Sequence, residues 1–251
     1  MSVVESRWLR RFASAEGSKL QLICFPHAGG AASAYLGLTR ALAPDIDVVA
    51  VQYPGRQERR LEPALTSLTH LARAVAEELA RAPQRPYAFF GHSMGAVVAY
   101  ETARVLAEFD LVTPRRLILS GRGAPSTEPR ASDRLAGDAA LIAEIRRLGG
   151  TGSRVLDDPE LLEMVLPTLR ADYAALSRYR WLPGPPLDIP LTVMVGTADP
   201  VVPVDDARGW LAHSTRPGDL LTFDGGHFYL DTRLPSVAEA VRTLLGQPTR
   251  V

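Results

Sequence analysis

From residue 87 to residue 95 the chain reads Tyr87-Ala88-Phe89-Phe90-Gly91-His92-Ser93-Met94-Gly95. The apolar start predicts a buried strand, and a helical pattern follows from about Ala96 to Ala107. A G-x-S-x-G sequence between a strand and a helix is typical of a nucleophile elbow, a sharp turn that presents a reactive serine. Gly91 and Gly95 supply the small residues that such a turn needs. A plain Gly-Ser turn is the alternative, and the flanking strand and helix disfavour it.

The order of the other elements predicts the fold class. Short β-rich runs bounded by Gly, Pro or Asp lie at Leu20–Phe25, Ile46–Gln52, Tyr87–Phe90, Arg116–Ser120, Leu191–Val195 and Leu220–Phe223. Helical patterns lie between several of them, and the clearest repeats apolar residues from Leu68 to Leu79 on one face. This alternation predicts an α/β fold, with a mostly parallel sheet flanked by helices. The run Trp8–Phe12 is a candidate edge strand.

One stretch breaks this alternation. Between Ser120 and Pro190 there are amphipathic segments around Ala139–Leu148 and Leu161–Arg180, but no convincing strand. Long structureless loops are rare in compact domains, so we expect residues 125 to 187 to form a mobile helical lid over an apolar channel. An immobile cap is the alternative. The chain as a whole, residues 1–251, is predicted to be one domain.

Composition narrows the classes of partner. Lys plus Arg and Asp plus Glu both number 28, so no net charge favours nucleic acid or an anionic membrane. The single cysteine, Cys24, lies in an apolar run and predicts a buried thiol in a reducing compartment. Neither a signal-peptide core at Met1–Arg7 nor a membrane-spanning run is apparent, which predicts a cytoplasmic protein.

A serine nucleophile needs a base, and the chain has five histidines. His227 follows Asp224-Gly225-Gly226 after the last predicted strand, where a loop can bring the imidazole over the sheet edge, and triads of this type run in the order Ser, Asp or Glu, His. We therefore expect His227 to be the base. The other four are less well placed: His92 adjoins Ser93 on the wrong side of the elbow, His27 lies in an early loop, and His70 and His213 lie in helical patterns that suggest surface or capping roles.

The acid that orients the base should lie between Ser93 and His227. Asp199 directly follows the predicted strand Leu191–Val195 and is the preferred candidate. Asp224 is its rival, although an Asp before two glycines is commonly a turn former. The oxyanion donors are expected to be the backbone N–H groups of Met94 and Ala28.

Four separated motifs point to one family. They are Phe25-Pro26-His27-Ala28-Gly29-Gly30, Tyr53-Pro54-Gly55-Arg56, Gly91-His92-Ser93-Met94-Gly95 and Gly225-Gly226-His227-Phe228. Together they resemble the type II thioesterases, stand-alone editing enzymes of the α/β-hydrolase superfamily that serve polyketide synthases and nonribosomal peptide synthetases in antibiotic biosynthesis.

The resemblance also implies a substrate and a site. The substrate would be an aberrant acyl group held as a thioester on the phosphopantetheine arm of an acyl carrier or peptidyl carrier protein. Ser93, Asp199 and His227 fall on the family's triad, and Ala28 and Met94 fall on its oxyanion hole. No cofactor or metal is implied.

Two other functions share these sequence features. A carboxylesterase or lipase acting on free small esters would use the same triad, and a non-catalytic binding protein could keep the fold. For a carrier-protein partner, we expect a local basic rim made of Arg56, Arg59 and Arg60, extended by Arg146 and Arg147 of the lid. The alternative is that the first three are solvated or paired with Glu58 and Glu62.

Overall fold

The computed structural model describes residues 6–13, 15, 17–82, 85–127, 131–135, 137–149 and 156–246. The expectation that no signal peptide is present falls mainly on residues 1–5, which lie outside this range. Seven strands form one sheet in the order β1-β3-β2-β4-β5-β6-β7. Their bounds are β1 Leu9–Arg11, β2 Gln21–Phe25, β3 Asp47–Val51, β4 Tyr87–His92, β5 Leu117–Ser120, β6 Leu191–Gly196 and β7 Asp219–Phe223.

The sheet is parallel except at one edge. Strands β2 to β7 pair in parallel, whereas β1 pairs antiparallel with β3, with Leu9 opposite Val51. Every residue of β2 to β6 is buried, as expected for a parallel sheet covered on both faces. The predicted α/β fold and the edge strand at residues 8–12 are both confirmed.

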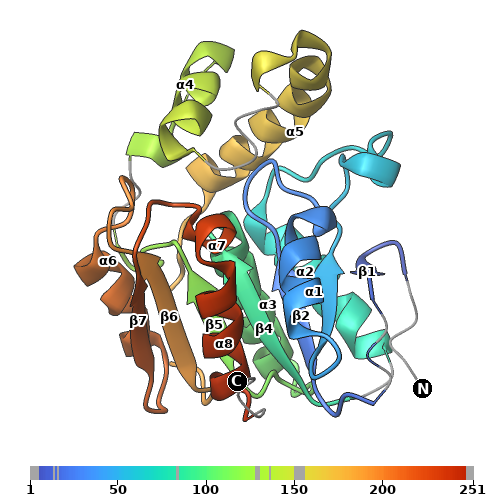
Figure 1. The fold of residues 1–251 in the computed structure, drawn as a ribbon, viewed down its shortest axis with the longest axis vertical. Helices are drawn as coiled ribbons and strands as arrows, with labels where there is room; N and C mark the ends of the chain where they lie inside the picture. Colours follow the sequence, from blue (N-terminus) through green and yellow to red (C-terminus); the bar gives the residue numbers. More distant parts are fainter. Residues whose placement is uncertain are drawn as a thin grey trace.

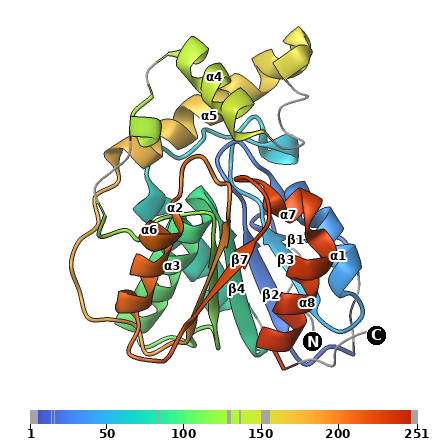
Figure 2. The ribbon, with the colours of Figure 1, turned by 60° about the vertical axis from the view of Figure 1, so that its left-hand side comes forward.

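Helices cover both faces of this sheet. They are α1 Leu36–Leu42, α2 Leu68–Arg81, α3 Met94–Glu108, α4 Asp138–Leu148, α5 Pro159–Arg178, α6 Val204–Arg208, α7 Tyr229–Thr232 and α8 Leu234–Leu244. Figure 2 shows α2, α3 and α6 on one face and α1, α7 and α8 on the other. The helices on each face pack against the sheet and form a hydrophobic core there. The predicted apolar stripe of α2, from Leu68 to Leu79, is buried in the core on the first of these two faces. None of the helices in the described ranges is long and apolar enough to span a bilayer.

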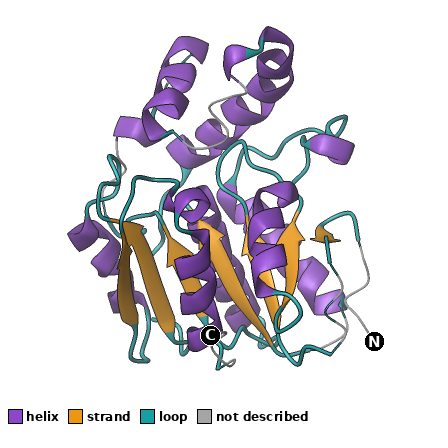
Figure 3. Ribbon diagram, in the orientation of Figure 1, coloured by secondary structure: helices purple, strands orange, loops and turns teal. Residues whose placement is uncertain are grey.

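The segment between β5 and β6 stands apart from these layers. Its longer helices, α4 and α5, lie above the end of the sheet in Figures 1 and 3. In the described part of this segment the β-structure is a single bridge residue, Leu187, paired with Ser214. Helix α5 buries Leu169 and Leu176 toward its end, whereas Met164 near its start is 65% exposed. The first six residues of α5 are therefore mostly exposed, and the helix packs against the core from Val165 onward.

Candidate active site

The serine of the G-x-S-x-G motif lies at a strained turn. Ser93 joins β4 to α3 with φ 55° and ψ −118°, a conformation that residues other than glycine rarely adopt. A Cβ atom on Gly91 would overlap the carbonyl group of Gly95, and one on Gly95 would overlap the carbonyl oxygen of Phe25. Both glycines are therefore required by the packing, and the turn has the geometry expected of a nucleophile elbow.

Two backbone regions flank this turn. Met94 is the first residue of α3, so its N–H is not bonded within the helix and lies at the positive end of the helix dipole. Ala28 lies in the loop after β2, where Gly29 has φ 74°. Because Gly95 contacts the carbonyl of Phe25, this loop starts beside the first turn of α3.

The histidine and the aspartate come from the ends of two neighbouring strands. Asp199 follows β6 and His227 follows β7, and Oδ2 of the carboxylate lies 2.8 Å from Nδ1 of the imidazole. Both side chains are buried, at 0% and 3% exposure. Oδ1 of Asp199 accepts the N–H groups of Val201 at 2.8 Å and Val202 at 3.1 Å. The carboxylate is thus held from both sides, and it favours the tautomer with hydrogen on Nδ1 and a free electron pair on Nε2.

Ser93, Asp199 and His227 lie at the same edge of the sheet, since each follows the carboxyl end of a parallel strand. The ring centroids of His227 and His92 are 5.0 Å apart, which places the imidazole beside the residue that precedes Ser93. Among the residues that the structure describes, the side chains of Ser93 and His227 form no hydrogen bond. Such bonds are often long without substrate and shorten in the complex.

The remaining histidines have other partners. Nδ1 of His92 lies 2.9 Å from Oγ of Ser120, and burial followed by the nearby His227 lowers the pKa of His92 well below its usual value. Burial, followed by His227, lowers the pKa of His27 to about 4. Exposed His70 donates its backbone N–H to the capping Ser67. The surface or capping role expected for His213 is wrong, because the side chain is buried in the core.

Asp224, the rival for the acid role, is exposed to solvent and has a different partner. Its side chain is 79% exposed and forms an ion pair with Arg233. Asp199 is therefore the carboxylate that the structure places against His227. Among the described residues, no group of three or more His, Cys, Asp or Glu side chains is arranged to hold a metal ion.

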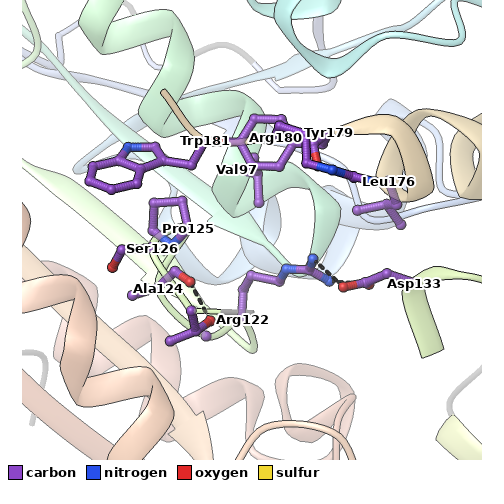
Figure 4. Close-up of a pocket in the computed structure, with 12 residues that line it drawn as sticks. Val97, Arg122, Ala124, Pro125, Ser126, Asp133, Leu176, Tyr179, Arg180 and Trp181 are labelled. Atoms are coloured by element: carbon purple, nitrogen blue, oxygen red, sulfur yellow. Dashed lines mark hydrogen bonds and ion pairs between the residues drawn. The ribbon is translucent and has the colours of Figure 1, made fainter. Parts of the chain in front are cut away.

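A cavity of about 260 Å³ lies between the core and the end of α5 (Figure 4). Val97, one helical turn beyond Ser93, lines it together with Leu176 and Trp181. On another side, Arg122 forms a two-pronged ion pair with Asp133, at 2.7 and 2.8 Å. Thr127 and Arg180 also line the cavity, so its lining is part apolar and part polar, and the Arg122–Asp133 pair neutralises one section of it.

Comparison with known proteins identifies the family. A family model described as thioesterase domain matches residues 20–245. The chain is 45% identical to a probable cadicidin biosynthesis thioesterase of Streptomyces griseus over 92% of this chain and 64% of that relative, and 44% identical to the thioesterase PikA5 of Streptomyces venezuelae over 92% and 83%. The solved structure of the type II thioesterase BorB, from the borrelidin biosynthetic cluster, superposes with a TM-score of 0.85 at 39% identity, covering 98% of this chain and 99% of that one.

The chain belongs to the thioesterase family. The resemblance to type II thioesterases that the four sequence motifs predicted is thereby confirmed. In this thioesterase, serine, aspartate and histidine lie at the three strand ends described above.

The basic rim predicted on this thioesterase is wrong for two of its members. Arg56 is buried and pairs with Asp172 of α5. Arg59 is also buried, because its guanidinium binds Glu62 and the carbonyl oxygen of Gln52, and lies over the ring of Trp8. The pair between Arg59 and Glu62 could be expected from the sequence, because the two residues are only three positions apart. Of the five predicted rim arginines, Arg60, Arg146 and Arg147 are exposed, and Arg147 binds Glu144.

Sequence reasoning also missed Asp172. This carboxylate lies on the buried face of α5, between the core residues Leu169 and Leu176, and accepts the N–H of Gly29 at 2.7 Å. A charged residue on the apolar face of a helix was the available signal, because such a group is rarely buried without a partner.

Proposed function

We propose that this thioesterase hydrolyses acyl thioesters through an acyl-enzyme on Ser93, with His227 as general base and Asp199 as the group that orients it. The observation that carries the proposal is the 2.8 Å contact between Nδ1 of His227 and Oδ2 of Asp199, at the sheet edge where Ser93 occupies its strained turn. A buried carboxylate on Nδ1 leaves Nε2 available to accept the serine proton.

In the first half of the reaction, Oγ of Ser93 attacks the thioester carbonyl and transfers its proton to Nε2 of His227. The N–H groups of Met94 and Ala28 stabilise the negative charge that develops on the carbonyl oxygen. The departing thiol has a pKa of about 8.5, so the C–S bond breaks with less acid assistance than an amide would need. The sulfur leaves with the proton from Nε2 of His227, which returns the imidazole to its neutral form for the second half of the reaction.

In the second half, His227 removes a proton from water, and the resulting hydroxide attacks the acyl group on Ser93. Collapse of this second tetrahedral intermediate releases the free acid and returns the proton to Oγ. Burial keeps the neighbouring rings of His27 and His92 neutral, since it lowers the pKa of both. The base therefore works beside two uncharged imidazoles.

We assign the acyl group to the cavity lined by Val97, Leu176 and Trp181, and a lid role to residues 125–187 of this single domain. Support comes from the position of α4 and α5 above the catalytic edge (Figure 1) and from the exposed start of α5. A bifunctional maleimide joining cysteines introduced at Arg147 of α4 and Pro200 after β6, where Nη1 of the guanidinium lies 3.2 Å from the Pro200 carbonyl oxygen, would pin the lid to the core. Gating predicts slower turnover only after crosslinking, and unchanged turnover would contradict it.

Relatives suggest how the substrate arrives. Their names place them in cadicidin biosynthesis and in the borrelidin biosynthetic cluster. By extension, this enzyme edits polyketide or nonribosomal peptide assembly, where it removes stalled acyl units from phosphopantetheine arms of carrier proteins.

The decisive experiment compares acyl groups on a panel of carrier proteins with the same groups on small thiols. Editing predicts a higher kcat/KM for the carrier-bound thioesters, with an acyl-enzyme trapped on Ser93. A carboxylesterase would instead prefer free oxygen esters, and a binding protein would form no acyl-enzyme. The Ser93→Ala variant supplies the background rate.

A further inference from the structure

A buried ion pair joins α5 to the loop that carries Ala28. Asp172 of α5 has 0% side-chain exposure, and Arg56, from the loop after β3, has 4%. Oδ2 of Asp172 pairs with the guanidinium of Arg56 and also accepts the backbone N–H of Gly29 at 2.7 Å. One carboxylate oxygen thus binds two segments that are distant in the sequence.

Arg56 holds the same loop from its other side. Its Nε donates to the carbonyl oxygen of Gly30 at 2.8 Å, and its Nη1 donates to the carbonyl oxygen of Pro54 at 2.9 Å. The guanidinium lies 4.9 Å from the ring centre of Tyr53. The N–H of Gly29 and the carbonyl of Gly30 are therefore both fixed by the pair, directly after the residue assigned as an oxyanion donor.

Packing reinforces this dependence on α5. A Cβ atom on Gly29 would collide with the side chain of Leu169, one helical turn before Asp172. Thr168 donates its hydroxyl to the carbonyl oxygen of Gly55 at 2.7 Å. The conformation of the loop, with φ 74° at Gly29, is thus set against the surface of α5.

Stability alone does not explain the pair. Burial raises the pKa of Asp172, which opposes the charged form, although Arg56 acts in the other direction. Oδ1 of Asp172 is buried and has no hydrogen-bond partner in the described part of the chain. Buried ion pairs are weak sources of stability but can fix one geometry.

We propose that Asp172 and Arg56 are positioning residues that couple the seating of α5 to the orientation of the Ala28 N–H. The oxyanion hole is then complete only while α5 is seated on the loop. This inference rests on the proposed function, because it gives the Ala28 N–H its catalytic role. The Asp172–Arg56 pair thereby links α5 to the chemical step, and not only to the access of substrate to the active site.

Three variants test the coupling: Asp172→Asn, Arg56→Lys and the double variant Arg56→Met with Asp172→Leu. Lysine keeps the charge but lacks the fork that serves three acceptors. The double variant removes both buried charges, which is often neutral or stabilising, yet leaves Gly29 without its acceptor. If a single variant fails to fold, the double variant decides.

We expect kcat per active site to fall about 10- to 100-fold in each variant, less than the roughly 10²- to 10³-fold loss of a whole oxyanion donor, with KM changed less than about threefold. A fluorophosphonate that labels Ser93 gives the active fraction. Affinity for a trifluoromethyl ketone, which forms a tetrahedral adduct, should fall in parallel with kcat.

The matched control is Arg170→Gln. Arg170 lies on α5, like Asp172, but its ion pair is with Asp138 of α4, so the substitution breaks a pair on the same helix without touching the loop that carries Ala28. It should keep kcat and analogue affinity. A double variant with kcat and analogue affinity within about threefold of wild type, or a loss confined to KM, would overturn the coupling. Failure of the proposed function itself would be visible in the wild type, as absent thioester hydrolysis or absent labelling of Ser93.

Discussion

Two of the serine–histidine pairs in this molecule, Ser93 with His227 and Ser126 with His213, differ in what holds the imidazole. At the sheet edge, His227 is bonded to the Asp199 carboxylate at 2.8 Å, close to the strained turn of Ser93. In the core beneath, His213 lies 3.2 Å from the hydroxyl of Tyr100 and 2.9 Å from the hydroxyl of Ser126.

The comparison shows that proximity of serine to histidine does not define a nucleophile. A carboxylate stabilises the imidazolium that forms when the ring takes a proton, whereas a neutral hydroxyl does so far less. Burial also lowers the pKa of His213, with Arg104 adding to the effect, so this ring resists protonation. Ser126 lies between β5 and the short helical turn Ala131–Asp133, whereas Ser93 directly precedes α3, whose first N–H groups have no partner within the helix.

The largest expected effect separates the two serines. Ser93→Ala should reduce thioester hydrolysis by about 10⁶-fold, to background, because the elbow accepts alanine but loses the nucleophile. Ser126→Ala should leave turnover within about twofold of wild type. Single-turnover release of thiol measures both, with circular dichroism as the check on folding. Activity retained in Ser93→Ala would assign the nucleophile elsewhere.

The base should be comparably important. His227→Ala is expected to match Ser93→Ala, and the double variant should be scarcely worse, since triad members act as a unit. The measurement is kcat for the two single variants and the double variant on one thioester. Losses that multiply would place His227 outside the unit.

The third prediction concerns the acid. Asp199→Asn should lower kcat about 10⁴-fold, by analogy with the protease triad, because the amide favours the wrong imidazole tautomer. Asp224→Asn is the matched control, with an exposed side chain paired to Arg233, and should have little effect. The reverse ranking would transfer the role to Asp224.

Local signals explain why much of this site could be predicted from sequence. Ser93 needs its glycines and its strand–helix context within nine residues, and Asp199 and His227 each follow a short apolar run that ends at the same sheet edge. The mostly parallel sheet likewise follows from elements that alternate along the chain.

Pairings between distant segments could not be predicted in the same way. Arg56 and Asp172 are 116 residues apart, and no periodic pattern joins them, so the sequence alone predicts Arg56 to be a surface charge. The wrong prediction of a surface or capping role for His213 has the same cause, because its partners Tyr100 and Ser126 come from other parts of the chain. Burial of a polar residue depends on tertiary packing, which overrides local patterns.

A smaller effect tests the uncharged histidines around the base. The pKa of His27 is lowered to about 4, mainly by burial and then by His227, while an unfolded histidine titrates near about 6.5. Between these values the unfolded chain binds more protons, so the free energy of unfolding falls as pH decreases from about 6.5 to 4, by at most about 3 kcal/mol from this residue. Urea unfolding across this range should show a shallower pH dependence for His27→Gln, whereas the exposed His70→Gln should follow wild type. Parallel curves for His27→Gln and wild type would contradict the prediction.

The smallest expected effect on turnover is at His213, where stability should change and chemistry should not. His213→Leu leaves the buried hydroxyl of Tyr100 without its partner, which costs about 1–3 kcal/mol of unfolding free energy. Adding Tyr100→Phe removes that unpaired hydroxyl and should recover most of the loss, since replacing both partners by apolar groups can be nearly neutral. Chemical denaturation of the two single variants and the double variant gives this coupling, and kcat should stay within about twofold of wild type throughout. A tenfold fall in kcat for His213→Leu, at full labelling of Ser93, would mean that the second serine–histidine pair takes part in the reaction after all.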